Sequence, residues 1–569
     1  MTSALFLLNA VVSLLVASGI AALQHPLISS PRQSDGPLFP PLIDATLADL
    51  STCLERGVFT SVDLVQAYIA RIKETNDLLH AVTEINPDAL TIAASLDAAR
   101  RDGQVLGPLH GIPVLIKNNI ATSDKMNNTA GSYALLGATV PSDSTVASKL
   151  RKAGAVILGK SNLSQWSGAR SENSSSGWSA HGGQTQGAYY PAQSPCGSSA
   201  GSGVAASLGL AWAALGTETS GSIQCPACYN NVVGIKPTVG LTSRHLVIPI
   251  SEHQDTVGPL ARTVEDAAFL LQAIVGKDKF DNYTSAIPFD VDDFPDYVSA
   301  CQTSALRGKR IAVTRGVIDT DEIGLPDEVA EPLMTTFNES LDIIRSAGAT
   351  VVDDIFLPGW KDFVEGDFVT SVLLADFFTV MPRYLSHLET NPHNISSLRD
   401  ISSFTHSYPD EEYPARDTKI FDHTLEQRKN NTDYNVWTNR TLGLRLAGTM
   451  GILGAMKNYS LDAIVLPTYF AEDPPAMLGT PAVTVPMGRY PDEMPIVKNR
   501  FGNLVEFGPN VPFGISFLGE SFTEEKLIGM AYAFEQRTMI RQKVHPYLQP
   551  KTEIADVVGA RLKSVELEL

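Results

Sequence analysis

The chain has 569 residues, 44% of them hydrophobic, and a formal net charge of -19. A chain of this length can bury a large core. Its lysines and arginines form no cluster or stripe, which excludes the basic surface with which proteins bind nucleic acid. We therefore expect an acidic globular protein with no nucleic-acid partner.

The chain begins with an uncharged apolar run over residues 3–23 that ends in small residues. Such a run is typical of a secretory signal peptide, and we predict a signal peptide over residues 1–22. About 20 apolar residues can also span a bilayer, so an uncleaved leader would anchor the protein to a membrane.

N-x-Ser/Thr triplets are unusually dense in this sequence, which suits secretion or a secretory-pathway lumen and predicts N-glycosylation. The triplets begin at Asn127, Asn162, Asn173, Asn282, Asn338, Asn394, Asn430, Asn439 and Asn458.

Helices and strands are predicted to alternate after a helical opening segment over residues 42–101. An apolar strand over residues 112–116 ends directly before Lys117, and a helix over 144–153 precedes a strand over 156–158. Later segments repeat this order, with strands over 310–314, 350–355 and 461–466 and helices over 327–347 and 527–537. This alternation predicts an α/β architecture.

The chain becomes polar between about residues 280 and 439, where Asp, Tyr, Pro and the glycosylation triplets accumulate. We interpret this stretch as a peripheral insertion that shapes the rim of a pocket.

Glycine, serine and alanine are concentrated between residues 196 and 237. Residues 202–214 carry no charge and predict a buried helix whose start lies beside Gly197 and Ser198. A helix start offers free N–H groups and a partial positive charge. Residues 216–223 form a turn of small residues, in which backbone amides can converge on one point as an oxyanion hole.

A serine in such a turn becomes a good nucleophile only when a base accepts its proton. A lysine can act as that base when burial lowers its pKa towards neutrality. Lys117 ends an apolar strand, as this role requires. On spacing alone, however, an exposed lysine at a strand end is the simpler interpretation.

The sequence contains five cysteines, too few for a disulfide scaffold. Cys225 and Cys228 have the spacing of a redox or zinc pair, but neither a second pair nor a nearby histidine completes a site. We expect small buried residues here and no metal site, and a disulfide elsewhere stays open.

The sequence resembles the amidase signature family. The resemblance is carried in order by GSSAGS, GTETSGSIQCPA and VVGIKPTVGLTS, and it extends to PLHGIPVLIKNN, GKSNLSQW, QDTVGPLARTVEDA and GTPAVTVPMG. It is closest to the branch of peptide amidases and related plant and fungal amidases. It implies one α/β domain over about residues 30–560, with a mixed sheet of many strands covered by helices on both faces.

The resemblance also implies the site chemistry. Ser222 would be the acylating nucleophile, Ser198 a bridging serine that follows a cis peptide, and Lys117 the base of a cofactor-free amidase. The implied substrate is a small-molecule or peptide amide, and the protein would be a monomer or homodimer. The backbone amides of the oxyanion hole are expected at Thr219, Ser220, Gly221 and Ser222. The substrate-binding residues are expected at Asn162, Arg170 and Gly197.

Four positions depart from the family pattern: Cys196, Ala200 and Ser220 stand where glycine is usual, and Glu218 where aspartate is usual. A residue other than glycine is strained at a positive φ. The resemblance to the peptide amidase branch changes the expected substrate rather than the mechanism.

Three alternatives remain beside this hypothesis. Ser199 fits the G-x-S-x-G elbow of α/β-hydrolases, although residues 190–195 predict a loop where that motif requires a strand. An amide-forming acyltransferase or tRNA-dependent amidotransferase uses similar motifs, but the leader and acidic charge argue against the tRNA-dependent enzyme. A catalytically silent relative would bind amides without turnover. His245 and His253 have no catalytic spacing, and Asp255 and Arg262 are expected to be structural or orienting rather than catalytic.

Overall fold

A mixed β-sheet organises the described part of the chain, which comprises residues 39–290, 293–318, 320 and 324–568 of a computed structural model. The predicted signal peptide lies outside these residues. The chain from Phe39 onward forms one unit, and the predicted α/β class with a mixed sheet is confirmed.

The main sheet has eleven strands within the described residues. In spatial order they are β1 (Val82–Ile85), β3 (Val156–Ser161), β2 (Pro113–Lys117), β6 (Ala213–Glu218), β8 (Thr256–Ala261), β7 (Val233–Lys236), β12 (Ala482–Arg489), β15 (Pro512–Leu518), β11 (Ala463–Pro467), β9 (Arg310–Ala312) and β10 (Thr350–Val352). Two short pairs stand apart, β4 (Trp178–Ser179) with β5 (Gly183–Gln184) and β13 (Val497–Lys498) with β14 (Val505–Phe507).

Strands β2 and β6 are parallel neighbours, with Ile116 opposite Leu215. Their carboxyl ends therefore meet at the same edge of the sheet, which is where ligands bind in open α/β sheets. Lys117 ends β2 and Glu218 ends β6, so this register brings Lys117 close to the turn of small residues over 216–223.

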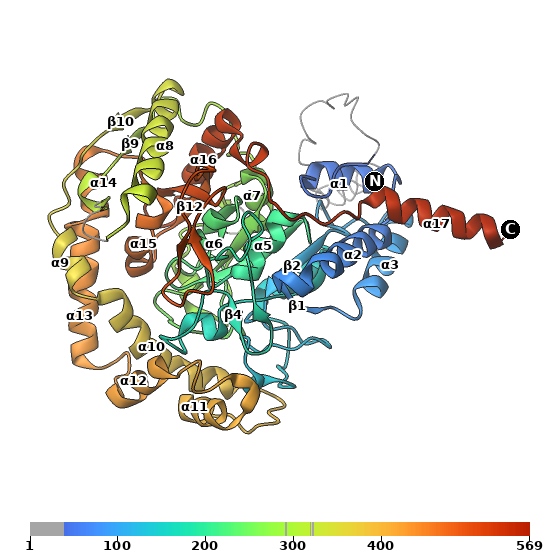
Figure 1. Cartoon of the computed structure of the whole chain (residues 1–569), viewed down its shortest axis with the longest axis horizontal. Helices are drawn as coiled ribbons and strands as arrows, with labels where there is room; N and C mark the ends of the chain where they lie inside the picture. The colour runs from blue at the N-terminus through green and yellow to red at the C-terminus, as the bar shows by residue number, and fades with distance from the viewer. Residues whose placement is uncertain (1–38, 291–292, 319, 321–323, 569) are drawn as a thin grey trace, which may run out of the picture. The chain divides into compact units, whose positions relative to one another are not determined.

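Helices pack on both faces of the sheet (Figure 1). They are α1 (Leu47–Glu55), α2 (Ser61–Leu79), α3 (Ala89–Arg101), α4 (Thr145–Lys152), α5 (Ala200–Leu208), α6 (Gln224–Tyr229), α7 (Val264–Ile274), α8 (Asp327–Ser346), α9 (Trp360–Glu365), α10 (Phe368–Leu385), α11 (Leu398–Ser407), α12 (Lys419–Gln427), α13 (Tyr434–Leu444), α14 (Ile452–Tyr459), α15 (Asp473–Leu478), α16 (Glu524–Thr538) and α17 (Ile554–Glu568).

Local capping explains several helix boundaries. Thr60 and Asp63 form a capping box at the start of α2, and the Ser144 hydroxyl accepts a hydrogen bond from the backbone N–H of Ala147 at the start of α4. These side chains satisfy N–H groups that have no partner within the helix. The helix predicted over residues 144–153 is therefore confirmed.

The buried helix predicted over residues 202–214 is wrong at its C-terminal end. Helix α5 stops at Leu208, and Gly209 adopts a left-handed φ of 60°. Strand β6 then starts at Ala213. Because both elements are buried and apolar, hydrophobic periodicity cannot separate them, and the glycine at the helix end was the signal that marks the change.

The polar stretch over residues 280–439 contains two kinds of structure. Strands β9 and β10 and helix α8 extend the main sheet. Helices α9–α13 then gather on the side of the molecule away from α2 and α3, coloured yellow to orange in Figure 1. The peripheral part of this stretch is therefore helical and begins after β10.

Candidate active site

Lys117 lies at the end of β2 and is completely buried. Its Nζ is 2.7 Å from Ser198 Oγ, 2.8 Å from Thr217 Oγ1 and 3.2 Å from the Thr217 carbonyl oxygen. Asn119 Nδ2 donates to the same Thr217 hydroxyl at 2.9 Å. The amine is thus held by β6 and directed at the loop that carries Ser198.

Burial lowers the pKa of Lys117 from its ordinary value to about 7, and the carboxylates of Asp255 and Glu218 partly oppose this shift. The cause is desolvation, which disfavours the charged form of an amine. A substantial fraction of Lys117 is therefore neutral near pH 7 and able to accept a proton.

Ser198 follows a cis peptide bond from Gly197, and its side chain is buried at 3% exposure. Just before it, Cys196 has a φ of 51°, in the region that favours glycine. Of the four departures from the family pattern, Cys196 alone has a positive φ. The expected strain therefore falls at this position only.

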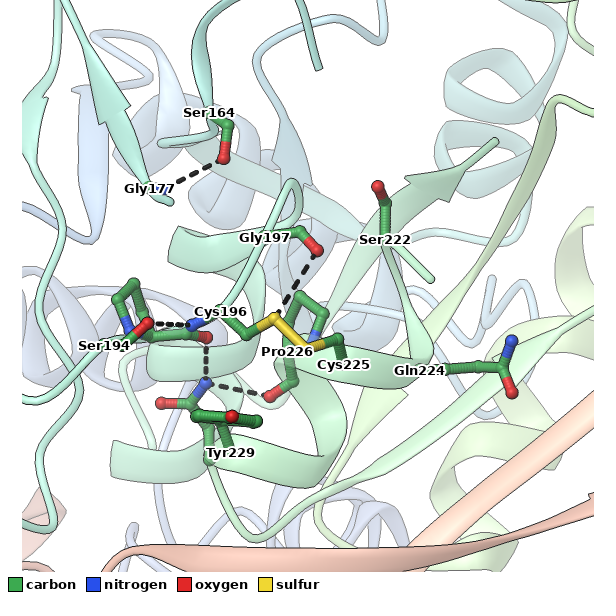
Figure 2. The surroundings of a disulfide bond; sticks show 12 residues. Ser164, Gly177, Ser194, Cys196, Gly197, Ser222, Gln224, Cys225, Pro226 and Tyr229 are labelled. Carbon is green, nitrogen blue, oxygen red and sulfur yellow. Dashed lines mark hydrogen bonds between the residues drawn. A yellow bond between two sulfur atoms is a disulfide. The ribbon is translucent and has the colours of Figure 1, made fainter. Parts of the chain in front are cut away.

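Cys196 forms a disulfide with Cys225, and Cys228 is a free, buried thiol. The bond joins the segment before Gly197 to the first turn of α6, the helix that Ser222 precedes (Figure 2). Sequence spacing drew attention to the pair Cys225 and Cys228, but only the folded chain brings Cys225 to Cys196.

Ser222 stands two residues before α6 and is 7% exposed. Its carbonyl oxygen accepts a hydrogen bond from Ser199 N at 3.2 Å, so the two serine segments are in contact. Its hydroxyl donates weakly to the Ser220 carbonyl at 3.5 Å. Within the described residues, no hydrogen bond joins the Ser198 and Ser222 hydroxyls in this conformation.

The turn before Ser222 is fixed by side chains at both ends. Glu218 accepts hydrogen bonds from the backbone N–H groups of Ile223 at 2.7 Å and Gln224 at 3.0 Å. Thr219 Oγ1 donates to Asp255 at 2.6 Å. The longer Glu218, which replaces the family's aspartate, caps α6 in this way.

The backbone N–H groups of Thr219, Ser220, Gly221 and Ser222 donate to no other group among the residues that the structure describes. Gly221 has a φ of 72°, a conformation that suits glycine. Amides that are free of internal partners in a small-residue turn are able to bind an oxyanion.

Ser199 does not have the surroundings of an elbow nucleophile. It is completely buried, and its hydroxyl donates to the Thr217 carbonyl at 3.0 Å and accepts from Thr217 N at 3.2 Å. No strand directly precedes it. The Ser199 hydroxyl thus braces the carboxyl end of β6.

Asn162 is buried, and both ends of its amide are bound within the protein. Its Nδ2 and Oδ1 contact His80, Gly182, Gly183, Thr185, Leu163 and Ser179. The amide leaves no room for a glycan in the folded chain, and its role is to hold loops together.

Arg170 is also occupied within the protein. All five of its N–H groups have acceptors, in Gln165, Glu411, Arg416 and Asp417. The ion pair with Glu411 measures 2.9 Å, with side-chain exposures of 1% and 0%. In this conformation Arg170 joins the segment after β3 to the segment between α11 and α12 by hydrogen bonds. It has no N–H donor left for a substrate.

Sequence reasoning missed Thr217 as the partner of Lys117 and gave Asp255 only a general orienting role. The contact between Lys117 and Thr217 depends on the register of the parallel strands β2 and β6, which the sequence alone does not give. Asp255 lies one residue before β8, beside Thr219, and burial raises its pKa to about 6.

The remaining features concern metals and membranes. Among residues 39–290, 293–318, 320 and 324–568, no group of three or more His, Cys, Asp or Glu side chains is arranged to hold a metal ion. In the same part of the chain, no helix has the length and apolar character needed to cross a bilayer.

Comparisons with known proteins agree with this geometry. The family model described as Amidase matches residues 63–528. The chain belongs to the amidase family. Its relatives and structural neighbours include amidases, and the protein is an amide-hydrolysing enzyme.

Individual relatives cover nearly the whole chain. A protein of Arthroderma benhamiae that carries the name of an amidase is 50% identical over 540 residues, 91% of this chain and 90% of its own. The crystal structure of peptide amidase from Stenotrophomonas maltophilia is 38% identical, with a TM-score of 0.78, and covers 90% of this chain and 100% of its own. A glutamyl-tRNA(Gln) amidotransferase chain of Prochlorococcus marinus is 31% identical, over 86% of this chain and 96% of its own.

Proposed function

We propose that this amidase cleaves a carboxamide through an acyl-enzyme on Ser222, with Ser198 as the proton bridge and Lys117 as the base. The observation that carries the proposal is the 2.7 Å hydrogen bond between the Lys117 amine and the Ser198 hydroxyl, in a buried site that lowers the pKa of the amine to about 7. A lysine acts as a base only when it can lose its charge at working pH.

Lys117 Nζ donates to Ser198 Oγ and to the carbonyl and hydroxyl oxygens of Thr217 in this structure. In the neutral form that we propose as the base, two hydrogens remain directed at Thr217 and the lone pair faces Ser198 Oγ. As Ser222 Oγ attacks the amide carbon, its proton passes to Ser198 and the Ser198 proton passes to Lys117. The reverse transfer protonates the departing amine, and water then releases the acid.

Rotation of the Ser222 side chain completes the relay. Its present bond to the Ser220 carbonyl is long, at 3.5 Å, and is therefore weak. A hydrogen bond that tightens only when substrate binds is common in apo enzymes. The free amides of residues 219–222 would then stabilise the charge that develops on the substrate oxygen.

The proposed substrate is a peptide or small-molecule carboxamide. The similarity to a peptide amidase at 38% identity supports this class. We further propose a secreted or lumenal glycoprotein on the basis of the leader and the triplets. We propose a monomer or homodimer, as the family resemblance implies. The triplet asparagines whose side chains are exposed are the candidates for glycans: Asn173, Asn282, Asn338, Asn394 and Asn458.

Release of ammonia from a panel of carboxamides, peptide amides included, tests this function. The purified protein should release ammonia, and Ser222→Ala should abolish release while the circular dichroism spectrum stays unchanged. Ser202→Ala, a buried serine of α5 outside the relay, is the matched control. Activity that survives in Ser222→Ala would refute the nucleophile, and glutamine-dependent amide formation on tRNA would favour the amidotransferase instead.

A further inference from the structure

Glu472 lies directly against the turn that carries the proposed nucleophile. A Cβ atom placed on Gly221 would lie 2.1 Å from Glu472 Oε2, so the carboxyl group covers the residue before Ser222. The next residue, Asp473, accepts a hydrogen bond from Ser220 Oγ at 3.1 Å. Ser220 replaces a usual glycine of the family, so one departure from the pattern contacts this acidic pair.

The half-buried carboxyl group of Glu472 has neither a hydrogen-bond donor nor a basic partner among the described residues. Burial raises the pKa of Glu472 well above its ordinary value, and the nearby carboxylates of Glu218 and Asp473 raise it further. A carboxyl group that is only partly solvated gains a charge-assisted hydrogen bond when a cation binds beside it. Such groups gather at functional sites.

An aromatic wall adjoins Glu472 along α6. The turn over Thr468–Phe470 packs against α6, and its Tyr469 is 44% exposed. The ring of Tyr469 lies 6.2 Å from that of Phe507, which lies 6.4 Å from that of Tyr229 in α6. These three rings line a small cavity.

A second carboxyl group, Glu506, directly precedes Phe507 of this wall in β14. Burial raises the pKa of Glu506. The pKa of Tyr469 is raised by burial and by the negative charges of Glu506 and Glu472. No lysine or arginine forms an ion pair with either glutamate within the described residues.

We propose that Glu472, Tyr469 and Glu506 form a subsite beside Ser222 that binds a cationic group, an ammonium or guanidinium, on the acyl part of the substrate. This inference rests on the proposed function and adds the substrate class. An aromatic face and carboxylates are the two groups that recognise such cations. A bound cation supplies the partner that Glu472 lacks.

The same arrangement disfavours anionic substrates. Glu218, Glu472 and Asp473 surround the turn, and the whole chain carries a net charge of -19. A substrate carboxylate placed here would meet like charge in a poorly solvated site, which costs more than it does in water.

Three Nα-acetyl amino-acid amides that differ only in their side chain test the subsite: those of lysine, norleucine and glutamate. In the wild-type enzyme, kcat/KM should fall in that order. Glu472→Gln, which keeps the shape and removes the charge, should lower the lysine-to-norleucine ratio about tenfold, the loss of one favourable charge interaction of about 1.4 kcal/mol.

Glu493→Gln, which changes an exposed glutamate outside this group, is the control and should leave the ratio unchanged. Binding of the lysine and norleucine amides to the Ser222→Ala protein, measured by calorimetry, gives a readout without turnover. Tighter binding of the lysine amide that Glu472→Gln removes would support the subsite. An absence of hydrolysis of any amide would refute the proposed function and leave this binding result unaffected. Hydrolysis of neutral amides with equal kcat/KM for all three compounds would overturn the subsite alone.

Discussion

The signature core, which comprises the strand ends and turns around Lys117, Ser199 and Glu218, differs from the peripheral helices α9–α13 in the contacts that hold it together. In the core, Lys117, Ser199 and Glu218 each have hydrogen bonds to backbone or side chains within a few sheet positions, and small residues let the segments approach closely. In the periphery, α10–α12 pack through large apolar side chains, including Phe377 and Phe421. The comparison indicates that the core sets the chemistry, while the periphery is a separate layer that can vary.

Several contacts join these regions, and two of them come from one segment. Arg170 and Glu411 form the buried ion pair, and the ring of Trp166 lies 6.3 Å from that of Phe421. Both core residues belong to the segment that follows β3. Movement of the peripheral helices would therefore reach the signature core through this segment, and also through residues 251–253, which α10 contacts.

The largest expected effect separates two buried lysines. Lys117→Met should lower kcat/KM by about 10³-fold or more, because it removes the base while the core stays packed. Lys160, whose pKa burial also lowers to about 7, donates instead to the Ile120 carbonyl and Asn128 Oδ1. Lys160→Met should lower the free energy of unfolding by about 1–3 kcal/mol and change kcat/KM little. Initial rates and urea unfolding distinguish the two; equal losses of activity would refute the assignment.

Breaking the link between core and periphery should come next. Arg170→Met leaves Glu411 buried without its partner, which should cost about 3–5 kcal/mol of stability in urea unfolding. The double variant Arg170→Met with Glu411→Gln should recover part of that loss, since no buried charge remains unpaired. A double variant that is as unstable as the sum of the two single variants would show that the pair does not couple the regions.

Removing the disulfide should have an intermediate effect. Cys196 and Cys225 are 29 residues apart, and loss of a crosslink that closes such a loop costs about 3–4 kcal/mol. Cys196→Gly with Cys225→Ala should be more stable than Cys196→Ala with Cys225→Ala by about 1 kcal/mol, because the φ of 51° favours glycine. Thermal unfolding of both double variants measures the difference; alanine as stable as glycine would contradict the strain at this position.

The smallest effect is a dependence on pH. Only the neutral amine of Lys117 accepts a proton, and its pKa is about 7. Below that pH, log kcat/KM should rise with pH with a slope of about 1, and it should level off above it. A profile that falls as pH rises through 7 would contradict a lysine base. The measurement uses a neutral amide, so that the titration of Glu472 affects substrate binding least.

Local signals predicted much of the core from the sequence. The apolar strand before Lys117 and the helix over residues 144–153 are confirmed because each depends on neighbours a few residues away. The boundary between α5 and β6 was missed because both are buried and apolar. The family resemblance, rather than periodicity, brought Lys117 and Ser198 together, 81 residues apart.

Long-range pairs had no such signal. Arg170 and Glu411 are 241 residues apart, and nothing in either neighbourhood identifies the other. Glu472 lies 251 positions after Gly221 in the sequence yet covers it in the fold, and no motif marks it. Pairings of this kind depend on sheet order and helix packing, which local patterns do not specify.

The central claim is that Ser222 carries the acyl group. The most direct measurement is mass spectrometry of the intact protein and of its peptides after reaction with a fluorophosphonate that phosphonylates activated serines. We predict one adduct per chain, on the peptide that contains Ser222, and none in the Lys117→Met variant. An adduct on Ser199, or labelling of Ser222 that persists without Lys117, would contradict the account.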